Sequence, residues 1–214
     1  MKEGSNIKRV MELSDKEYIE MAEKLDAEQC ILEETSIINA EYNRLLEERK
    51  ILINDIISEN TIEKVVMPLL RMDSDGSGKK ITIYINTNGG SVYDGLVLCD
   101  IIEQLKTETE VIVLGYAYSM GSIILMSGKN NPNVTRKCYP FSTALIHGGS
   151  AYISGSSSQV KDYFKFNEKF EKRIADFIVS HTNLTEDDYA AIERYEAYMD
   201  SDEMLEKGLV DEII

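Results

Sequence analysis

The sequence predicts an α/β fold, a parallel β-sheet covered by helices, in one domain with an N-terminal extension. Between residues 81 and 128, strand-like runs rich in β-branched residues alternate with helix-like runs, which is typical of parallel sheets. A chain of 214 residues suffices for one such domain and an appendage, but not for two independent domains. We therefore divide the chain into an extension over residues 1–48 and a domain over residues 49–214.

The extension is predicted to be largely helical. From residue 14 to residue 49 the chain contains no Gly or Pro and is rich in Glu, Lys, Leu, Ala and Met, which favour helices. Apolar residues recur there at helical spacing, as at Leu25, Ile31, Leu32 and Ile38. This pattern predicts a long amphipathic helix.

The domain is predicted to begin with a short strand and a helix. Pro68 should kink that helix, because proline lacks an amide hydrogen and its ring clashes with the preceding turn. The polar run at residues 72–80 is predicted to be a turn. The predicted strands are 51–53, 81–86, 111–118, 143–146 and a segment near Val210; the predicted helices are 61–71, 91–106, 120–128, 159–180, 186–196 and 202–207.

Composition argues against several classes of function. With 23 Lys and Arg against 38 Asp and Glu, the formal net charge of −15 argues against a nucleic-acid-binding protein or one that binds an anionic membrane surface. No apolar stretch approaches the roughly 18 residues of a membrane span, and the N-terminus lacks the apolar core of a signal peptide. Cys30, Cys99 and Cys138 lack the spacing of a zinc site or a disulfide framework. A reducing cytoplasm is the predicted location.

Ser119 is the candidate nucleophile. It lies between the predicted strand 111–118 and a helix that begins at Met120, so its hydroxyl and the next amide meet at the positive end of a helix. A serine at such a turn can attack a carbonyl carbon if a base is near. A serine at a helix start also commonly caps the helix, and on this feature alone capping is the more frequent role.

The turn Asn86-Thr87-Asn88-Gly89-Gly90 closes another predicted strand. Paired glycines let the backbone turn sharply and approach a ligand, so their amides can bind an anionic oxygen or an extended peptide. Because many strand-to-helix turns use two glycines, the pair indicates a site only together with other features.

His147 is the candidate base, in a chain with only two histidines. It follows the predicted strand 143–146 and precedes Gly148-Gly149, at a strand end from which a side chain can enter a site. His181 closes the predicted helix 159–180, where a residue that can carry positive charge suits the negative helix end. His147 is therefore preferred as the base.

Four segments together resemble the proteolytic subunit of the Clp proteases, ClpP: IYINTNGGSVYDG, GYAYSMGS, LIHGG and EKGLVDEII. Their order and spacing are similar across residues 49–214. The resemblance implies a ClpP/crotonase-like fold, a repeated β-β-α superhelix with a protruding strand-helix handle made of residues 148–155 and the helix 159–180. It also implies a homoheptameric ring, or two such rings paired into a tetradecamer, with the sites facing an interior chamber.

Position by position, the resemblance makes Ser119 the nucleophile and His147 the general base. It makes the backbone amides of Gly90 and Met120 the oxyanion hole. Glu196 occupies the position of the family's triad aspartate. A glutamate can also orient a histidine, although its extra methylene requires a shifted backbone.

The sequence departs from the family pattern in three places. The triad acid is a glutamate here, and Asp200 and Asp188 are alternatives for its role. Gly148-Gly149 stands where the family usually has Gln-Pro. The roughly 48 residues at the N-terminus replace the short axial segment near which the family's partner ATPase docks, so the role of that partner is open.

We expect a serine endopeptidase that hydrolyses unfolded proteins or peptides inside a ring chamber and needs no metal or organic cofactor. A separate AAA+ unfoldase would use any ATP, because the run at residues 73–80 lacks the leading Gly and the final Ser or Thr of a P-loop. Three alternatives stay open. They are a viral capsid-maturation protease of the same fold, an inactive ring-scaffold subunit, and a crotonase-type acyl-CoA enzyme, which also uses two amides as its oxyanion hole.

Overall fold

The computed structural model describes residues 20, 23–24, 37–150, 152–192 and 194–214. The chain divides into two compact units, residues 1–44 and 45–214. The helix predicted over residues 14–49 lies mostly outside the described residues, within which residues 37–47 are helical. The predicted boundary at residue 48 stays a prediction.

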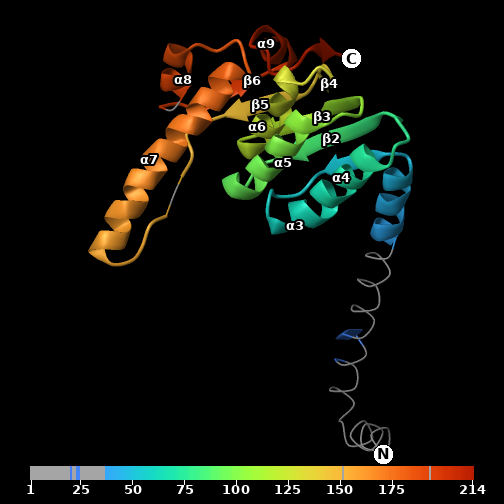
Figure 1. Ribbon diagram of the computed structural model, residues 1–214, viewed down its shortest axis with the longest axis horizontal. Helices are drawn as coiled ribbons and strands as arrows, with labels where there is room; N and C mark the ends of the chain where they lie inside the picture. Colours follow the sequence, from blue (N-terminus) through green and yellow to red (C-terminus); the bar gives the residue numbers. More distant parts are fainter. Residues whose placement is uncertain (1–19, 21–22, 25–36, 151, 193) are drawn as a thin grey trace, which may run out of the picture. The chain divides into compact units, whose positions relative to one another are not determined.

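The second unit is an α/β fold, which confirms the fold class expected from the alternation of strands and helices (Figure 1). The strands are β1 (Lys50–Ile53), β2 (Ile81–Thr87), β3 (Thr109–Tyr118), β4 (Val134–Cys138), β5 (Thr143–Ile146), β6 (Ala197–Met199) and β7 (Glu212–Ile213). The helices are α3 (Glu59–Thr61), α4 (Met67–Ser74), α5 (Val92–Gln104), α6 (Met120–Met126), α7 (Ser157–Ser180), α8 (Glu186–Ile192) and α9 (Ser201–Glu206). A π-helical turn (Ile62–Val66) joins α3 to α4, and a 3-10 turn (Ser127–Asn130) follows α6.

The seven strands of the described residues form one sheet, in which only the pair β5–β6 is antiparallel. The order along the sheet is β1-β2-β3-β4-β7, and β5 pairs with both β3 and β6. The sheet branches at β3, because the first half of this strand (residues 109–113) pairs with β4 and the second half (residues 116–118) pairs with β5. Between the branches, Gly115 has a φ of +119°, which glycine adopts without steric cost. As a result, the C-terminal end of β5 lies beside the C-terminal end of β3.

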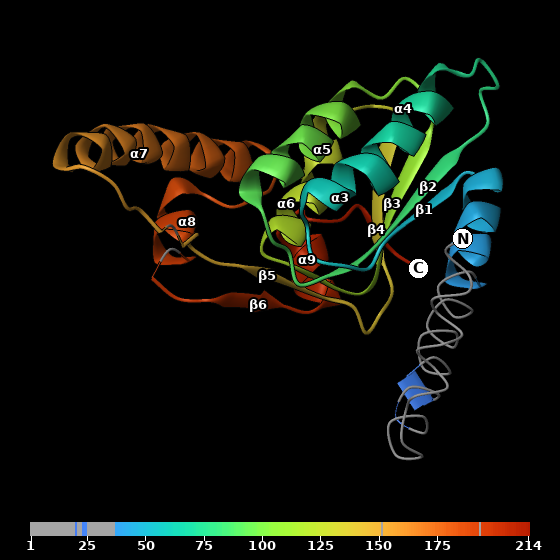
Figure 2. The ribbon, with the colours of Figure 1, turned by 90° about the horizontal axis from the view of Figure 1, so that it is seen from below.

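The core lies between the sheet and the helices α4, α5 and α6, together with the π-helical turn. The helices α3, α4 and α5 lie side by side on one face of the sheet (Figure 2). Along β2 every second residue is buried, and this alternation places Ile81, Ile83 and Ile85 in the core. By contrast, α7 runs away from the sheet in both views and buries only Ile178 (Figures 1 and 2). No helix among the described residues is long and apolar enough to cross a membrane.

Several elements differ from the sequence-based prediction. The kink expected at Pro68 takes the form of the π-helical turn that precedes α4, because proline cannot donate to the preceding turn and its ring widens that turn. The helix predicted over 186–196 ends at Ile192. The handle strand expected over residues 148–155 is not formed by the described residues of that range, since the chain leaves the sheet after Ile146 and finds no neighbouring strand.

The strand β4 was not predicted, and its central residue, Arg136, is fully buried. The guanidinium donates to both carboxylate oxygens of Asp211, from Nε at 3.1 Å and from Nη2 at 2.5 Å. It also donates to the carbonyl oxygens of Gly208 and Leu209. Burial raises the pKa of Asp211, but the hydrogen bonds from Arg136 lower it by more, so the net pKa is below its ordinary value. This ion pair joins the C-terminal segment to the sheet.

We predict that Asp211→Asn lowers the free energy of unfolding by about 2–4 kcal/mol at pH 7, because it leaves the buried Arg136 without a counter-charge. Urea unfolding followed by circular dichroism measures this. The matched control is Glu212→Gln, which removes a more exposed partner of Lys137 and should cost at most about 1 kcal/mol. Since the pKa of Asp211 is lowered, the difference from the wild type should shrink as the pH falls through that pKa. Equal stabilities of the two variants at pH 7 would contradict the prediction.

Candidate active site

The structure brings the two strongest sequence candidates together. The Nε2 atom of His147 lies 2.8 Å from the Oγ atom of Ser119, which is hydrogen-bonding distance. Ser119 holds the N-cap position of α6, yet its side chain makes no capping hydrogen bond. The more frequent capping role is therefore wrong for this serine, and its hydroxyl is paired with a base instead.

The backbone of Ser119 is strained. Its φ and ψ are +53° and −119°, a region that a residue with a Cβ rarely adopts. Apart from Arg49, Ser119 is the only described residue other than glycine with a positive φ. With this backbone conformation, the hydroxyl contacts His147 and makes no hydrogen bond to the first turn of α6.

Both partners are held by the pairing of β3 with β5. Tyr118 is in register with Leu145, and the amide of Ser119 donates to the carbonyl oxygen of Leu145 at 2.8 Å. The buried hydroxyl of Ser122, one turn into α6, donates to the same carbonyl at 2.7 Å. His147 follows two residues after Leu145, so the branched sheet fixes its distance from Ser119.

The glycine turn lies directly against the serine turn. A Cβ on Gly89 would come within 2.6 Å of the Tyr118 carbonyl oxygen and 2.8 Å of the Met120 nitrogen, so only glycine fits there. Its φ of +90° also favours glycine. This contact places the amide of Gly90 and the amide of Met120 on neighbouring turns.

Two hydrogen bonds clamp the backbone on either side of Gly90. The Ile57 amide donates to the Gly89 carbonyl at 2.9 Å, and the Ser91 amide donates to the Ile57 carbonyl at 2.8 Å. Within the described residues, the amides of Gly90 and Met120 donate no hydrogen bond. Two fixed, unused amide donors beside a serine are the arrangement that an anionic oxygen requires.

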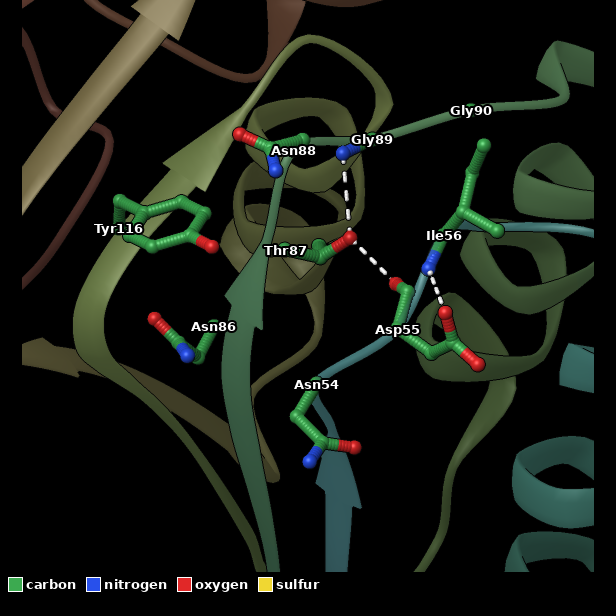
Figure 3. Close-up of a pocket in the computed structure, with 9 residues that line it drawn as sticks. All are labelled: Asn54, Asp55, Ile56, Asn86, Thr87, Asn88, Gly89, Gly90 and Tyr116. Atoms are coloured by element: carbon green, nitrogen blue, oxygen red, sulfur yellow. Dashed lines mark hydrogen bonds between the residues drawn. The ribbon is translucent and has the colours of Figure 1, made fainter.

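The sequence did not single out Thr87, which anchors this turn (Figure 3). Its hydroxyl donates to the Asp55 carbonyl oxygen at 2.6 Å and accepts from the Gly89 amide at 3.1 Å. The turn also borders a cavity of about 360 Å³, shown in Figure 3, to which the polar residues Asn54, Asn86, Asn88 and Tyr116 contribute. The only sequence signal was a hydroxyl residue two positions before Gly89.

A second cavity, of about 340 Å³, opens at Ser119 and His147. Its lining is mostly apolar and comes from α5, α6, β5 and α7; the apolar contributors include Val92, Ile123, Ile146, Ile174 and Ile178. Glu171, Tyr189 and Gly148-Gly149 also line it. An apolar side chain next to the serine would be removed from water here.

The structure does not bring any of the three candidate acids to His147. The Glu196 carboxylate is exposed and accepts a hydrogen bond from the Tyr198 hydroxyl at 3.0 Å. Asp200 caps α9 by accepting from the Glu203 amide, and Asp188 accepts from the backbone and hydroxyl of Thr185. Pairing of an acid with His147 stays a prediction, for Glu196 as for the two alternatives.

The remaining candidates have structural roles. His181 ends α7, where its ring contacts Glu103 at 2.5 Å and stacks on Phe177. Cys99 and Cys138 are free and buried, and burial raises the pKa of both thiols, that of Cys138 to about 11. Both side chains are fully buried, so neither thiol is accessible to a substrate. In the described part of the chain, no three His, Cys, Asp or Glu side chains are grouped to hold a metal ion.

Comparisons with known proteins agree with this geometry. A sequence model of the Clp protease family matches residues 33–214. The ATP-dependent Clp protease proteolytic subunit of Deinococcus radiodurans is 32% identical over 173 residues, which cover 81% of this chain and 83% of that protein. The subunit of Carsonella ruddii is 30% identical with coverage of 81% and 87%. Proteolytic subunit 3 of Streptomyces avermitilis is 32% identical with coverage of 81% and 77%.

Proposed function

This chain belongs to the Clp protease family, and from that premise we propose that it is a serine endopeptidase with Ser119 as nucleophile and His147 as general base. The observation that carries the proposal is the 2.8 Å contact between Ser119 Oγ and His147 Nε2 at a strained turn. The family match covers that turn and the whole sheet that holds it.

In the proposed reaction, His147 takes the proton of Ser119 as the hydroxyl oxygen attacks the carbonyl carbon of a peptide bond. The amides of Gly90 and Met120 bind the oxyanion, and His147 then gives its proton to the leaving amine. Water, activated by the same histidine, releases the acyl group from Ser119. The apolar cavity next to Ser119 takes the side chain that precedes the scissile bond.

We further propose that Glu196 is the acid that orients His147 when substrate is cleaved. It directly precedes β6, whose Ala197 pairs with Ile146, the residue before His147. A carboxylate at that place would hold the proton of His147 on Nδ1 and leave Nε2 to accept from Ser119.

Partners and location are proposed from the family relationship. We propose a homo-oligomeric ring, a heptamer or two paired heptamers, that works with a separate AAA+ unfoldase on unfolded proteins. The relatives are named as subunits of ATP-dependent Clp proteases, which is consistent with such an arrangement. A cytoplasmic location fits the free thiols of Cys99 and Cys138.

The alternatives lose support for different reasons. The matched family model is that of the Clp proteases, which disfavours a crotonase-type acyl-CoA enzyme. The contact between Ser119 and His147 disfavours an inactive scaffold subunit, which has no need of a strained serine. Capsid maturation would differ only in the substrate protein, and the bacterial relatives favour unfolded cellular proteins.

The experiment that tests the proposal is active-site labelling with a fluorophosphonate, followed by mass mapping of the adduct. We expect one adduct per chain, on Ser119, and loss of hydrolysis of a fluorogenic peptide with an apolar residue before the scissile bond. A short peptide needs no unfoldase. Ser122, three residues further on, is buried and bonded to the carbonyls of Ala117 and Leu145, so it is the internal control that should stay unmodified. An adduct at another residue, or hydrolysis that survives complete labelling, would overturn the assignment.

A further inference from the structure

The Glu196 carboxylate has a partner other than the histidine. It accepts a hydrogen bond from the Tyr198 hydroxyl at 3.0 Å. His147 uses Nε2 to contact Ser119, and within the described residues its Nδ1 atom has no hydrogen-bond partner. The catalytic pair and the acid proposed for it are therefore both in place but separated.

The register of β5 with β6, continued by one residue, sets the acid opposite its proposed target. The printed pairs are Ala144 with Met199, Leu145 with Tyr198 and Ile146 with Ala197, so the next pair outward would be His147 with Glu196. Directly opposite residues of antiparallel strands point to the same face, with Cβ atoms about 4.5–5.5 Å apart. A glutamate side chain spans that gap.

Tyr198, in β6, lies two residues after Glu196 and on the same face. Its hydroxyl can therefore hold the Glu196 carboxylate by a hydrogen bond. Its ring packs edge-on against Tyr118, with centroids 5.9 Å apart. The Tyr118 hydroxyl is 3.0 Å from the Thr143 hydroxyl, so the packing partner is tied to β5. The hydrogen bond to Glu196 raises the pKa of Tyr198 above its ordinary value, as expected for a hydroxyl that donates to a carboxylate.

We propose that Tyr198 is a positioning residue that holds the Glu196 carboxylate away from His147, so that the acid joins the Ser119–His147 pair only when the Tyr198–Glu196 hydrogen bond breaks. This inference rests on the proposed function. It makes the structure described here a resting arrangement of the site. Any event that moves β6 relative to β5, such as contact with substrate or with a second subunit, would change how often the acid reaches His147.

The test is Tyr198→Phe, which removes the hydroxyl and keeps the ring against Tyr118. Freed from the hydroxyl, Glu196 should orient His147 in a larger fraction of molecules. We expect kcat for a fluorogenic peptide to rise about three- to tenfold with KM unchanged, since one hydrogen bond shifts an equilibrium by about this factor. The rate of fluorophosphonate labelling of Ser119 should rise by the same factor. A purely structural role would lower both rates or alter KM.

The matched control is Tyr118→Phe, which removes the neighbouring ring's hydroxyl from Thr143 and leaves the Tyr198–Glu196 contact. Its kcat should not rise, because the Tyr198–Glu196 hydrogen bond is kept. In the background of Glu196→Gln, Tyr198→Phe should have no effect, because the neutral amide cannot stabilise a protonated His147.

Three outcomes overturn the role of Tyr198: a Tyr198→Phe rate equal to or below that of the wild type, an equal gain in Tyr118→Phe, or a gain that persists with Glu196→Gln. The failure of the proposed function is a separate result, because it would appear in the wild type as the absence of an adduct on Ser119. An adduct on Ser119 whose rate of formation is the same in the wild type and in Tyr198→Phe would sink only this inference.

Discussion

Replacing Ser119 with alanine should lower kcat/KM for peptide hydrolysis by about 10⁴- to 10⁶-fold, because no other group can form the acyl-enzyme. Alanine keeps the Cβ atom, so the strained φ of +53° and its cost are the same in both proteins. The fold and the oligomer should therefore be unchanged. The loss of rate, measured with a fluorogenic peptide, can then be assigned to the missing hydroxyl.

The companion variants are His147→Ala and the double variant. If Ser119 and His147 act as one unit through their 2.8 Å contact, the double variant should be no slower than either single variant. If the loss of kcat/KM in the double variant instead equalled the product of the two single losses, the two residues would act independently. Activity of Ser119→Ala within about tenfold of the wild type would exclude this serine as the nucleophile.

Gly89→Ala should lower kcat/KM by about 10²- to 10³-fold, the effect of losing an oxyanion donor. The new methyl group would lie within 2.6 Å of the Tyr118 carbonyl and 2.8 Å of the Met120 nitrogen, and these backbone atoms cannot yield as a flexible side chain would. Either the glycine turn or the serine turn must move. The amides of Gly90 and Met120, which we propose as the oxyanion hole, would then change their relative position.

The control for this variant is Gly76→Ala. Gly76 also has a positive φ, +72°, but a Cβ there would meet nothing within 4 Å. Backbone strain therefore destabilises both variants, whereas only in Gly89→Ala does the new methyl group clash with atoms of the site. Steady-state kinetics and thermal unfolding of the pair separate these effects. If the two variants were equally active, the contact between the glycine and serine turns would have no part in catalysis.

Much of the sheet could be predicted from sequence, because its central strands are long apolar runs. The two missed strands lack that signal. In β4 the buried position is Arg136, whose partner Asp211 is 75 residues away along the chain, so the burial of a charge could not be foreseen. The strand β6 has three residues. The branching of β3 at Gly115 is also hidden, since its residues read as one continuous strand.

For the candidate site, sequence reasoning found Ser119, His147 and the two glycines but could not decide what the serine does. A capping serine and a nucleophilic serine look alike at a helix start, and only the position of His147 in space separates them. The acid could not be settled either. Glu196 precedes the strand that pairs with β5, but its carboxylate is hydrogen-bonded to Tyr198, a contact across two residues that no spacing rule predicts.

Gly148-Gly149, which lines the cavity at Ser119, has a consequence for the lifetime of bound peptides. A Cβ at Gly149 would meet nothing within 4 Å, so glycine is not required there by crowding. Glycine loses more backbone entropy on ordering than any other residue. Where a bound peptide orders this segment, the entropy loss opposes binding by roughly 1 kcal/mol of free energy per glycine. We therefore expect this segment to hold bound chains less tightly than residues with side chains would, so that cleaved fragments leave sooner.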